Sequence, residues 1–211
     1  MPEIKFCFSQ DESAQQFMAL PGCAAWGALQ PGMGRFAAES PMARVHRRSG
    51  SDDPEPAFAL TATTEPAHTL CAVAPQADAG PSQIVYAVHD GSGRFIGRIT
   101  HGRSPLGFRQ AWRIEDADKQ RSAVAYRGNI RGWIAYWVGS PFWAILALVF
   151  LLNGDLHPSG SLWSKPHRAR WRMRTGDGPK KVALDFHGRY RADTGVLDVN
   201  LIYAQAVLYG E

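Results

Sequence analysis

The strongest polar pattern in the sequence is a run of arginines at every second position between Arg168 and Arg174. On a β-strand, alternate side chains point to the same face, so these guanidinium groups are expected about 6–7 Å apart on one face. Two lysines follow across a predicted turn. Because cationic side chains bind phosphate oxygens, the pattern predicts a platform for anionic lipid headgroups. This predicted platform consists of Arg168, Arg170, Arg172, Arg174, Lys180 and Lys181.

An ordinary solvated strand face explains the same arginines and is the alternative interpretation. Nucleic acid is a less suitable partner, because single strands stack on exposed aromatic rings between basic groups and the alternation turns Trp171 to the other face. Residues 1–82 hold 5 basic and 9 acidic residues, whereas residues 83–211 hold 18 and 10. The second part of the chain is therefore the one expected to meet an anionic surface.

The sequence carries no recognisable motif for catalysis or for a metal or cofactor site. Asp185 and His187 share a predicted strand face, but two ligands do not make a zinc site. A strand, not a helix, follows Gly91, Gly93 and Gly97, so these glycines indicate a hairpin turn and not a dinucleotide loop. No Gly-x-Ser-x-Gly elbow is present. We therefore expect a non-enzymatic protein without metal or cofactor, and an enzyme with an unrecognised site is the remaining alternative.

The other functional feature is an uncharged run, Trp133–Leu152. As a single helix it would be roughly 30 Å long, which matches the hydrocarbon core of a bilayer. Alternatively, Trp133–Val138 forms a strand, and Ser140 and Pro141 start a buried core helix over 141–152. In the third interpretation, the run is a helical hairpin or re-entrant loop that enters the membrane from one leaflet.

Two of these interpretations place the run in lipid, so we expect a cytoplasmic protein associated with the membrane face or integral to it. The side chains expected to insert are Trp133, Trp137, Phe142, Trp143, Leu146 and Phe150. The alternative function is a soluble ligand-binding or protein-interaction module with 141–152 as its core helix. The N-terminus does not resemble a secretory signal peptide, and three cysteines at unpatterned spacing predict no disulfide framework.

The elements that position these features are β-hairpins. Residues 84–102, 110–128 and 168–188 each show a strand, a turn with Asp or Gly, and a second strand. Residues 1–82 hold nine of the fourteen prolines and predict a largely disordered Ala/Pro-rich region. The fold class expected is mainly β with α (α+β). It consists of an antiparallel hairpin meander or barrel of about seven or eight strands over 83–211, packed with a hydrophobic helix.

The repeated hairpins followed by an apolar C-terminal helix resemble the tubby C-terminal, phospholipid scramblase and LURP-one-related superfamily. The residues that carry this likeness are Val85–Asp90, Gly93, Ile96–Ile99, Trp112–Asp116, Val124, Trp171–Met173 and Val182–Phe186. The resemblance covers residues 84–211. It implies a twelve-stranded β-barrel around a central hydrophobic helix, and a role at membranes or with phosphoinositides.

Overall fold

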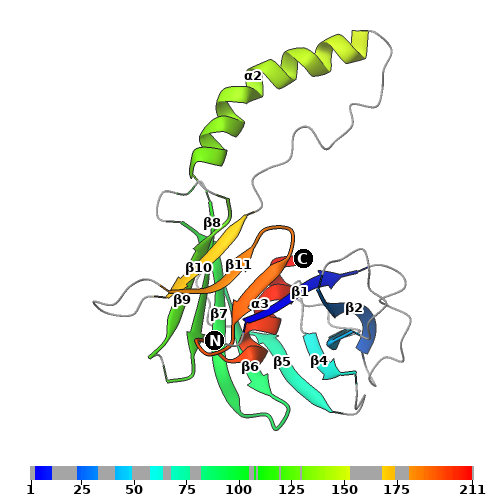
Figure 1. Ribbon diagram of the computed structural model, residues 1–211, viewed down its shortest axis with the longest axis vertical. Coiled ribbons are helices and arrows are strands. Elements are labelled where there is room, and N and C mark those ends of the chain that lie inside the picture. The colour runs from blue at the N-terminus through cyan, green and yellow to red at the C-terminus, as the bar shows by residue number, and fades with distance from the viewer. Residues whose placement is uncertain are drawn as a thin grey trace.

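The computed structural model describes residues 3–10, 23–32, 41–48, 58–63, 68–76, 82–104, 107, 109–118, 120–128, 130–152, 168–173 and 181–210. These residues contain twelve strands and two helices, labelled as in Figure 1. The strands are β1 (Glu3–Ser9), β2 (Cys23–Pro31), β3 (Ala43–Arg48), β4 (Phe58–Ala62), β5 (Thr69–Pro75), β6 (Gln83–Asp90), β7 (Phe95–Arg103), β8 (Gln110–Asp116), β9 (Ser122–Tyr126), β10 (Ala169–Met173), β11 (Val182–Phe186) and β12 (Tyr190–Asp193). The helices are α2 (Ile130–Leu152) and α3 (Val199–Gly210).

The twelve strands form one closed antiparallel barrel in which each strand pairs with its neighbour in sequence. The first and last strands complete the ring, with Phe6 of β1 opposite Tyr190 of β12. Closure leaves no strand edge free to pair with another chain. The barrel is the scaffold from which every candidate functional residue projects.

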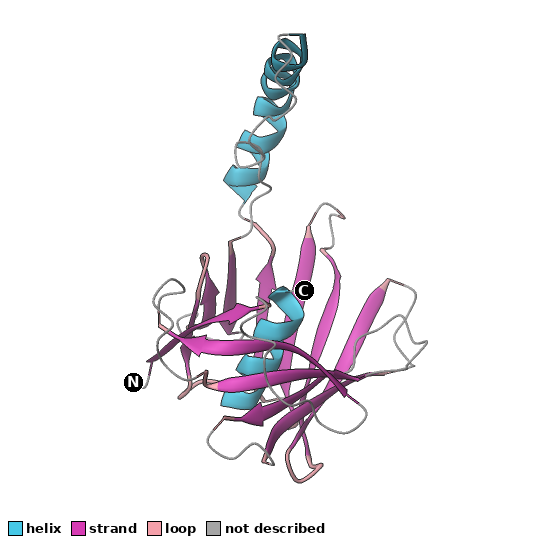
Figure 2. Ribbon diagram, turned by 90° about the vertical axis from the view of Figure 1, so that its right-hand side faces the viewer, coloured by secondary structure: helices cyan, strands magenta, loops and turns pink. Residues whose placement is uncertain are grey.

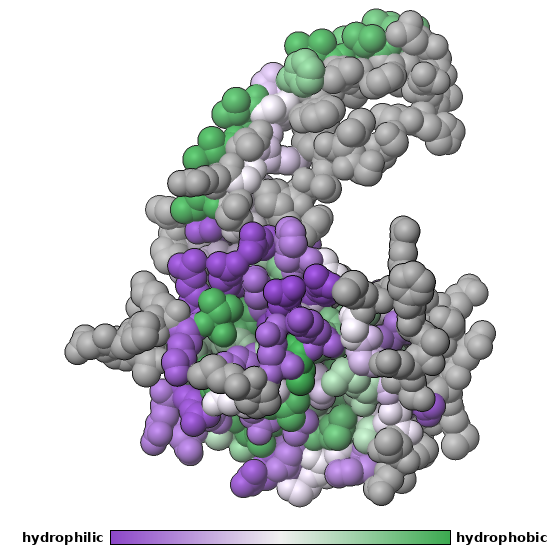
Figure 3. Space-filling model, viewed as in Figure 1, coloured by the Kyte–Doolittle hydropathy of each residue, from purple (hydrophilic) through white to green (hydrophobic). Residues whose placement is uncertain are grey.

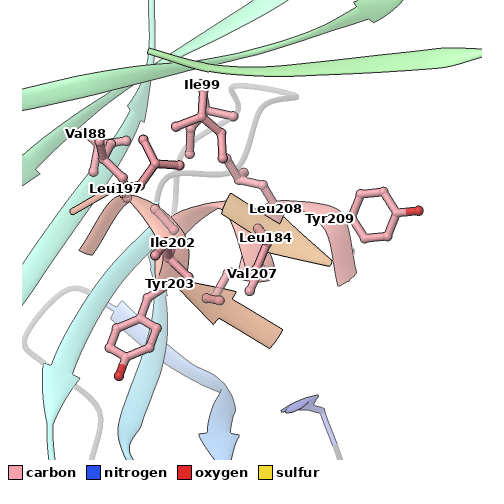
Figure 4. Close-up of a cluster of buried hydrophobic side chains, with 14 of the residues drawn as sticks. Val88, Ile99, Leu184, Leu197, Ile202, Tyr203, Val207, Leu208 and Tyr209 are labelled. Atoms are coloured by element: carbon pink, nitrogen blue, oxygen red, sulfur yellow. The ribbon is translucent and has the colours of Figure 1, made fainter. Parts of the chain in front are cut away.

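Helix α3 lies inside the barrel and supplies the centre of its core (Figure 2). Every residue from Leu201 to Tyr209 is buried. Figure 4 shows Ile202, Val207 and Leu208 of α3 among Val88, Ile99 and Leu184 of the surrounding strands. The Asp198 carboxylate accepts a hydrogen bond from the backbone amide of Asn200 at 2.8 Å, as a helix N-cap does. The hydroxyl of Tyr190 donates to the Ala206 carbonyl at 2.9 Å, which ties the helix to β12.

The three predicted hairpins are confirmed as β6–β7, β8–β9 and β10–β11. In the β6–β7 turn, the carboxylate of Asp90 accepts hydrogen bonds from the backbone amides of Ser92 and Arg94 at 2.9 and 3.0 Å. Gly93 has a φ of 85°, which favours glycine because other residues rarely adopt it. Aspartate and glycine therefore predict this hairpin turn for a structural reason: the aspartate accepts hydrogen bonds from the turn's backbone amides, and the glycine adopts its positive φ.

The prediction for residues 1–82 needs correction, because this region contributes β1 to β5 to the barrel. The barrel accordingly has twelve strands instead of seven or eight. The burial of these early strands depends on partners elsewhere in the chain. Phe6, for example, stacks on Tyr190 with ring centroids 5.2 Å apart. Two described prolines of this region, Pro31 and Pro75, are the last residues of β2 and β5.

The apolar run also differs from two of its three interpretations. It belongs to one continuous helix, α2, with Pro141 inside it, so there is neither a strand over 133–138 nor a helical hairpin. The core helix expected over 141–152 is wrong as well, because α2 projects away from the barrel in Figures 1 and 2. Length distinguishes the two helices: α3 has 12 residues and lies within the barrel, whereas α2 has 23 residues. At 1.5 Å per residue, α3 is about 18 Å long and α2 about 35 Å.

Candidate functional site

Helix α2 leaves the barrel between two strands that pair with each other, β9 and β10. The backbone amide of Gly128 donates to the carbonyl of Arg168 at 2.7 Å, which closes the base of the insertion. In the first turn of α2, the indole Nε1 of Trp133 donates to the carbonyl of Arg127 at 3.1 Å. The helix is thus fixed to the barrel at its N-terminal end.

The described side chains of α2 beyond its first turn are mostly apolar and exposed, and Figure 3 shows them as green atoms along the helix. Nine of the twelve exposed large hydrophobic residues described in the structure belong to this helix: Ile130, Ile134, Trp137, Val138, Phe142, Ile145, Leu148, Val149 and Leu152. Contiguous apolar surface of this kind marks contact with a membrane or another protein. Exposed apolar residues elsewhere on the described barrel are isolated.

The side chains predicted to insert divide into two groups. Trp137 and Phe142 are exposed, at 65% and 61%, and Trp133 is half-buried at the base of the helix. The side chains of Trp143, Leu146 and Phe150 lie outside the described part of the structure, although their backbone belongs to α2. The described apolar side chains in the middle of α2 are therefore exposed.

The predicted headgroup platform is less uniform than the sequence indicates. Ala169, Trp171 and Met173 of β10 face the core, while Arg170 and Arg172 face outwards as expected. One carboxylate, however, serves two arginines of the platform. Arg168 and Arg170 lie 3.8 and 3.3 Å from the carboxylate of Asp185 on β11, at nitrogen–oxygen distances typical of ion pairs.

The rest of the platform is divided along the barrel axis. Arg174 and Lys180 lie outside the described residues. Lys181 precedes β11 and is exposed at the end of the barrel opposite α2, whereas Arg168 stands at the base of α2. Arg172 is exposed on the side of the barrel. The structure therefore does not bring the described members together on one compact surface.

Five arginines, of which only Arg168 belongs to the predicted platform, gather around the base of α2. Each flanks the end of a strand on the β7–β12 side of the barrel, and together they form the arginine rim: Arg103, Arg109, Arg127, Arg168 and Arg189. Figure 3 shows hydrophilic side chains on the barrel below the apolar helix. No local motif announces this rim, because its members are separated by up to 86 positions in sequence and only the barrel brings their strand ends together.

Contacts within the barrel end hold two of the rim arginines in place. Arg109 donates to the Gly128 carbonyl at 3.2 Å and lies over the Tyr126 ring, 4.8 Å from its centroid. Arg127 donates to Oε1 of Gln110 at 3.0 Å, and its guanidinium lies 5.7 Å from the Tyr209 ring centroid. Positive charge is thus ordered at the point where α2 begins.

Beneath the rim, the interior of the barrel is closed by aromatic rings around Tyr209, the penultimate residue of α3. Trp112, Trp171 and Phe186 contact the Tyr209 ring edge-on, at centroid distances of 5.9, 5.3 and 5.2 Å. Burial raises the pKa of Tyr209 to about 12, and the charge of Arg127 opposes this shift. The phenol therefore stays neutral, and the cluster supports the rim without offering a catalytic group.

Two histidines give the barrel a pH-dependent stability. Burial, and to a smaller extent Arg44, lowers the pKa of His46, whose Nε2 lies 2.9 Å from the Thr61 hydroxyl. Burial and then Arg127 lower the pKa of His101. Both rings therefore bind a proton less readily in the folded state than in the unfolded chain, where they bind protons near pH 6.5. Their contribution to stability is therefore complete above about pH 6.5 and declines as the pH falls through 6.5 towards the folded-state pKa values.

We expect the free energy of unfolding to fall between about pH 6.5 and 5, with a shallower fall in the double variant H46Q/H101Q. Urea unfolding at a series of pH values measures both slopes. Wild type and variant are to be compared by slope and not by absolute stability, because the substitutions also change packing. Identical pH dependence in the two proteins would show that other groups are responsible.

Comparison of the chain with protein-family models, curated proteins and solved structures finds no match. Among the residues that the structure describes, no group of three or more His, Cys, Asp or Glu side chains could hold a metal ion. In the same part of the chain, no helix combines the length and apolar character needed to span a bilayer. The apolar helix and the arginines at its base are the features that geometry offers for a function.

Proposed function

We propose that this protein is a non-enzymatic β-barrel domain that associates with the cytoplasmic face of a membrane and binds anionic phospholipid. The observation that carries the proposal is the apolar surface of α2, with nine large hydrophobic side chains exposed on one helix. Moving a side chain such as Ile145 or Leu148 out of water contributes about 1.5–3 kcal/mol. Several of them together exceed what a stable membrane attachment needs.

Entry from one leaflet suits the way α2 is attached. The strands on either side of it, β9 and β10, pair with each other, with Arg172 opposite Val124. The chain therefore leaves and re-enters the same end of one closed barrel. A helix attached in this way enters the outer part of a bilayer while the barrel stays on the side from which it came.

The resemblance to the tubby, scramblase and LURP-one-related superfamily supports the same function. It implies twelve strands around a central hydrophobic helix, and the closed barrel around α3 agrees with that description. The helix α2 and the arginines at its base are not among the residues that carry this resemblance. Phospholipid is thus proposed from the exposed chemistry of this chain, with the family likeness as support.

Flotation of the full chain with lipid vesicles tests the proposal. We expect the protein to float with vesicles of phosphatidylcholine containing about one-third phosphatidylserine, since apolar insertion and charge act together there. Protein that stays at the bottom of the gradient with every vesicle composition would contradict it. A stable dimer that neither floats nor exposes α2 would instead show that the helix binds a second copy of the chain.

A further inference from the structure

The charges of the barrel half built from β7 to β12 are separated along its axis. At the α2 end stand the five arginines of the arginine rim, and the only carboxylate described beside them is Asp185, which pairs with Arg168 and Arg170. At the opposite end, acidic residues dominate at the strand ends and turns: Asp90, Glu115, Asp116, Asp118, Asp193 and Asp198. Arg94, Arg121 and Lys181 offset part of that negative charge, and Glu115 forms ion pairs with Arg98 and Arg113.

The arginine rim occupies the side of the barrel where α2 emerges, next to the apolar helix. Two more exposed arginines, Arg47 and Arg48, end β3 at the same end of the barrel but on its opposite side. Among the described residues, most of the arginines at this end therefore lie beside α2.

We infer that the arginine rim is the headgroup-binding surface, and that the barrel docks end-on with its β7–β12 side towards an anionic membrane. This inference rests on the proposed function and assigns its lipid contacts to the rim instead of the outer face of β10. With α2 in the bilayer, the base of the helix lies at the level of the headgroups. The rim arginines then meet lipid phosphates, to which guanidinium groups donate paired hydrogen bonds.

Geometry separates the rim from the strand platform. Arg172 lies on the side of the barrel, away from the surface that the base of α2 touches. Lys181 cannot reach that surface either, because the length of the barrel separates it from the helix. The acidic far end is directed away from the membrane, where it avoids repulsion by anionic lipid. Insertion of α2 holds the barrel at the membrane, and the attraction between the rim arginines and anionic lipid determines which side of the barrel faces the membrane.

The double variant R103Q/R189Q tests the inference, with R172Q/K181Q as the matched control. Each pair removes two positive charges, and the side chains of both pairs lie at the surface or are half-buried. Because each basic residue close to an anionic leaflet strengthens binding by about five-fold, the rim variant is expected to bind phosphatidylserine-containing vesicles about 25-fold more weakly. The control is expected to change by less than about two-fold, since its charges lie outside screening distance of the surface.

Neutral vesicles of phosphatidylcholine separate the two proposals. Rim variant and wild type are expected to bind them equally. When phosphatidylserine is added, the wild type is expected to gain about 25-fold more affinity than the rim variant, and high salt is expected to reduce this difference. An unchanged rim variant, or a control that weakens as much as the rim variant, would overturn end-on docking while vesicle binding through α2 stands. A wild-type protein that binds no vesicle would overturn both.

Discussion

Replacing Ile145 and Leu148 of α2 by glutamine is expected to weaken vesicle binding by about 100-fold or more and to leave the melting temperature unchanged. Each substitution removes an apolar side chain worth about 1.5–3 kcal/mol in lipid and adds an amide that loses hydrogen bonds there. Both side chains are exposed in the structure, so the barrel loses no packing. Glutamine adds no charge, which keeps the electrostatic attraction constant. Vesicle flotation and thermal unfolding measure the two effects.

The matched control makes the same change at exposed apolar positions on the barrel. Phe95 and Val182 are both 39% exposed and lie outside α2. The variant F95Q/V182Q should float as the wild type does. Equal loss of binding in both variants would mean that general surface hydrophobicity drives the association. Unfolding of the α2 variant would show that this helix packs against protein. That result would support the alternative function, a soluble interaction module.

Replacing Leu201 by alanine is expected to lower the free energy of unfolding by about 2–5 kcal/mol. Leu201 lies at 0% exposure in α3, where its side chain approaches the backbone of β7 at Gly97. The strands of a closed barrel cannot collapse freely into the space that a deleted isobutyl group leaves. Urea unfolding, followed by intrinsic fluorescence, measures the loss.

Leu148→Ala is the counterpart on α2. The same atoms are removed from an exposed site, so we expect a change within about 0.5 kcal/mol. Comparing the stability losses of L201A and L148A shows which of the two apolar helices forms the core of this protein. A larger loss of stability for L148A than for L201A would reverse the assignment of α3 as the core helix.

Much of the second half of the barrel could be predicted from the sequence, because its hairpins are local. A turn such as Asp90–Gly93 fixes which residues of β6 and β7 face each other, and the alternation of Trp171 with its arginine neighbours fixes the faces of β10. The first five strands could not be predicted in the same way. Their alternation is weak, and residues such as Phe6 become buried only when β12, almost the whole chain away, closes the ring.

The candidate site shows the same division. The uncharged run 133–152, the alternating arginines of β10 and the apolar C-terminal helix can be recognised in the sequence. Three other features depend on the tertiary structure: α2 stays outside the barrel, α3 fills it, and arginines from three strand connections form one rim. The physical reason is that hydropathy measures how much a segment avoids water, whereas the choice of which segment enters a barrel depends on whether its side chains fit the space.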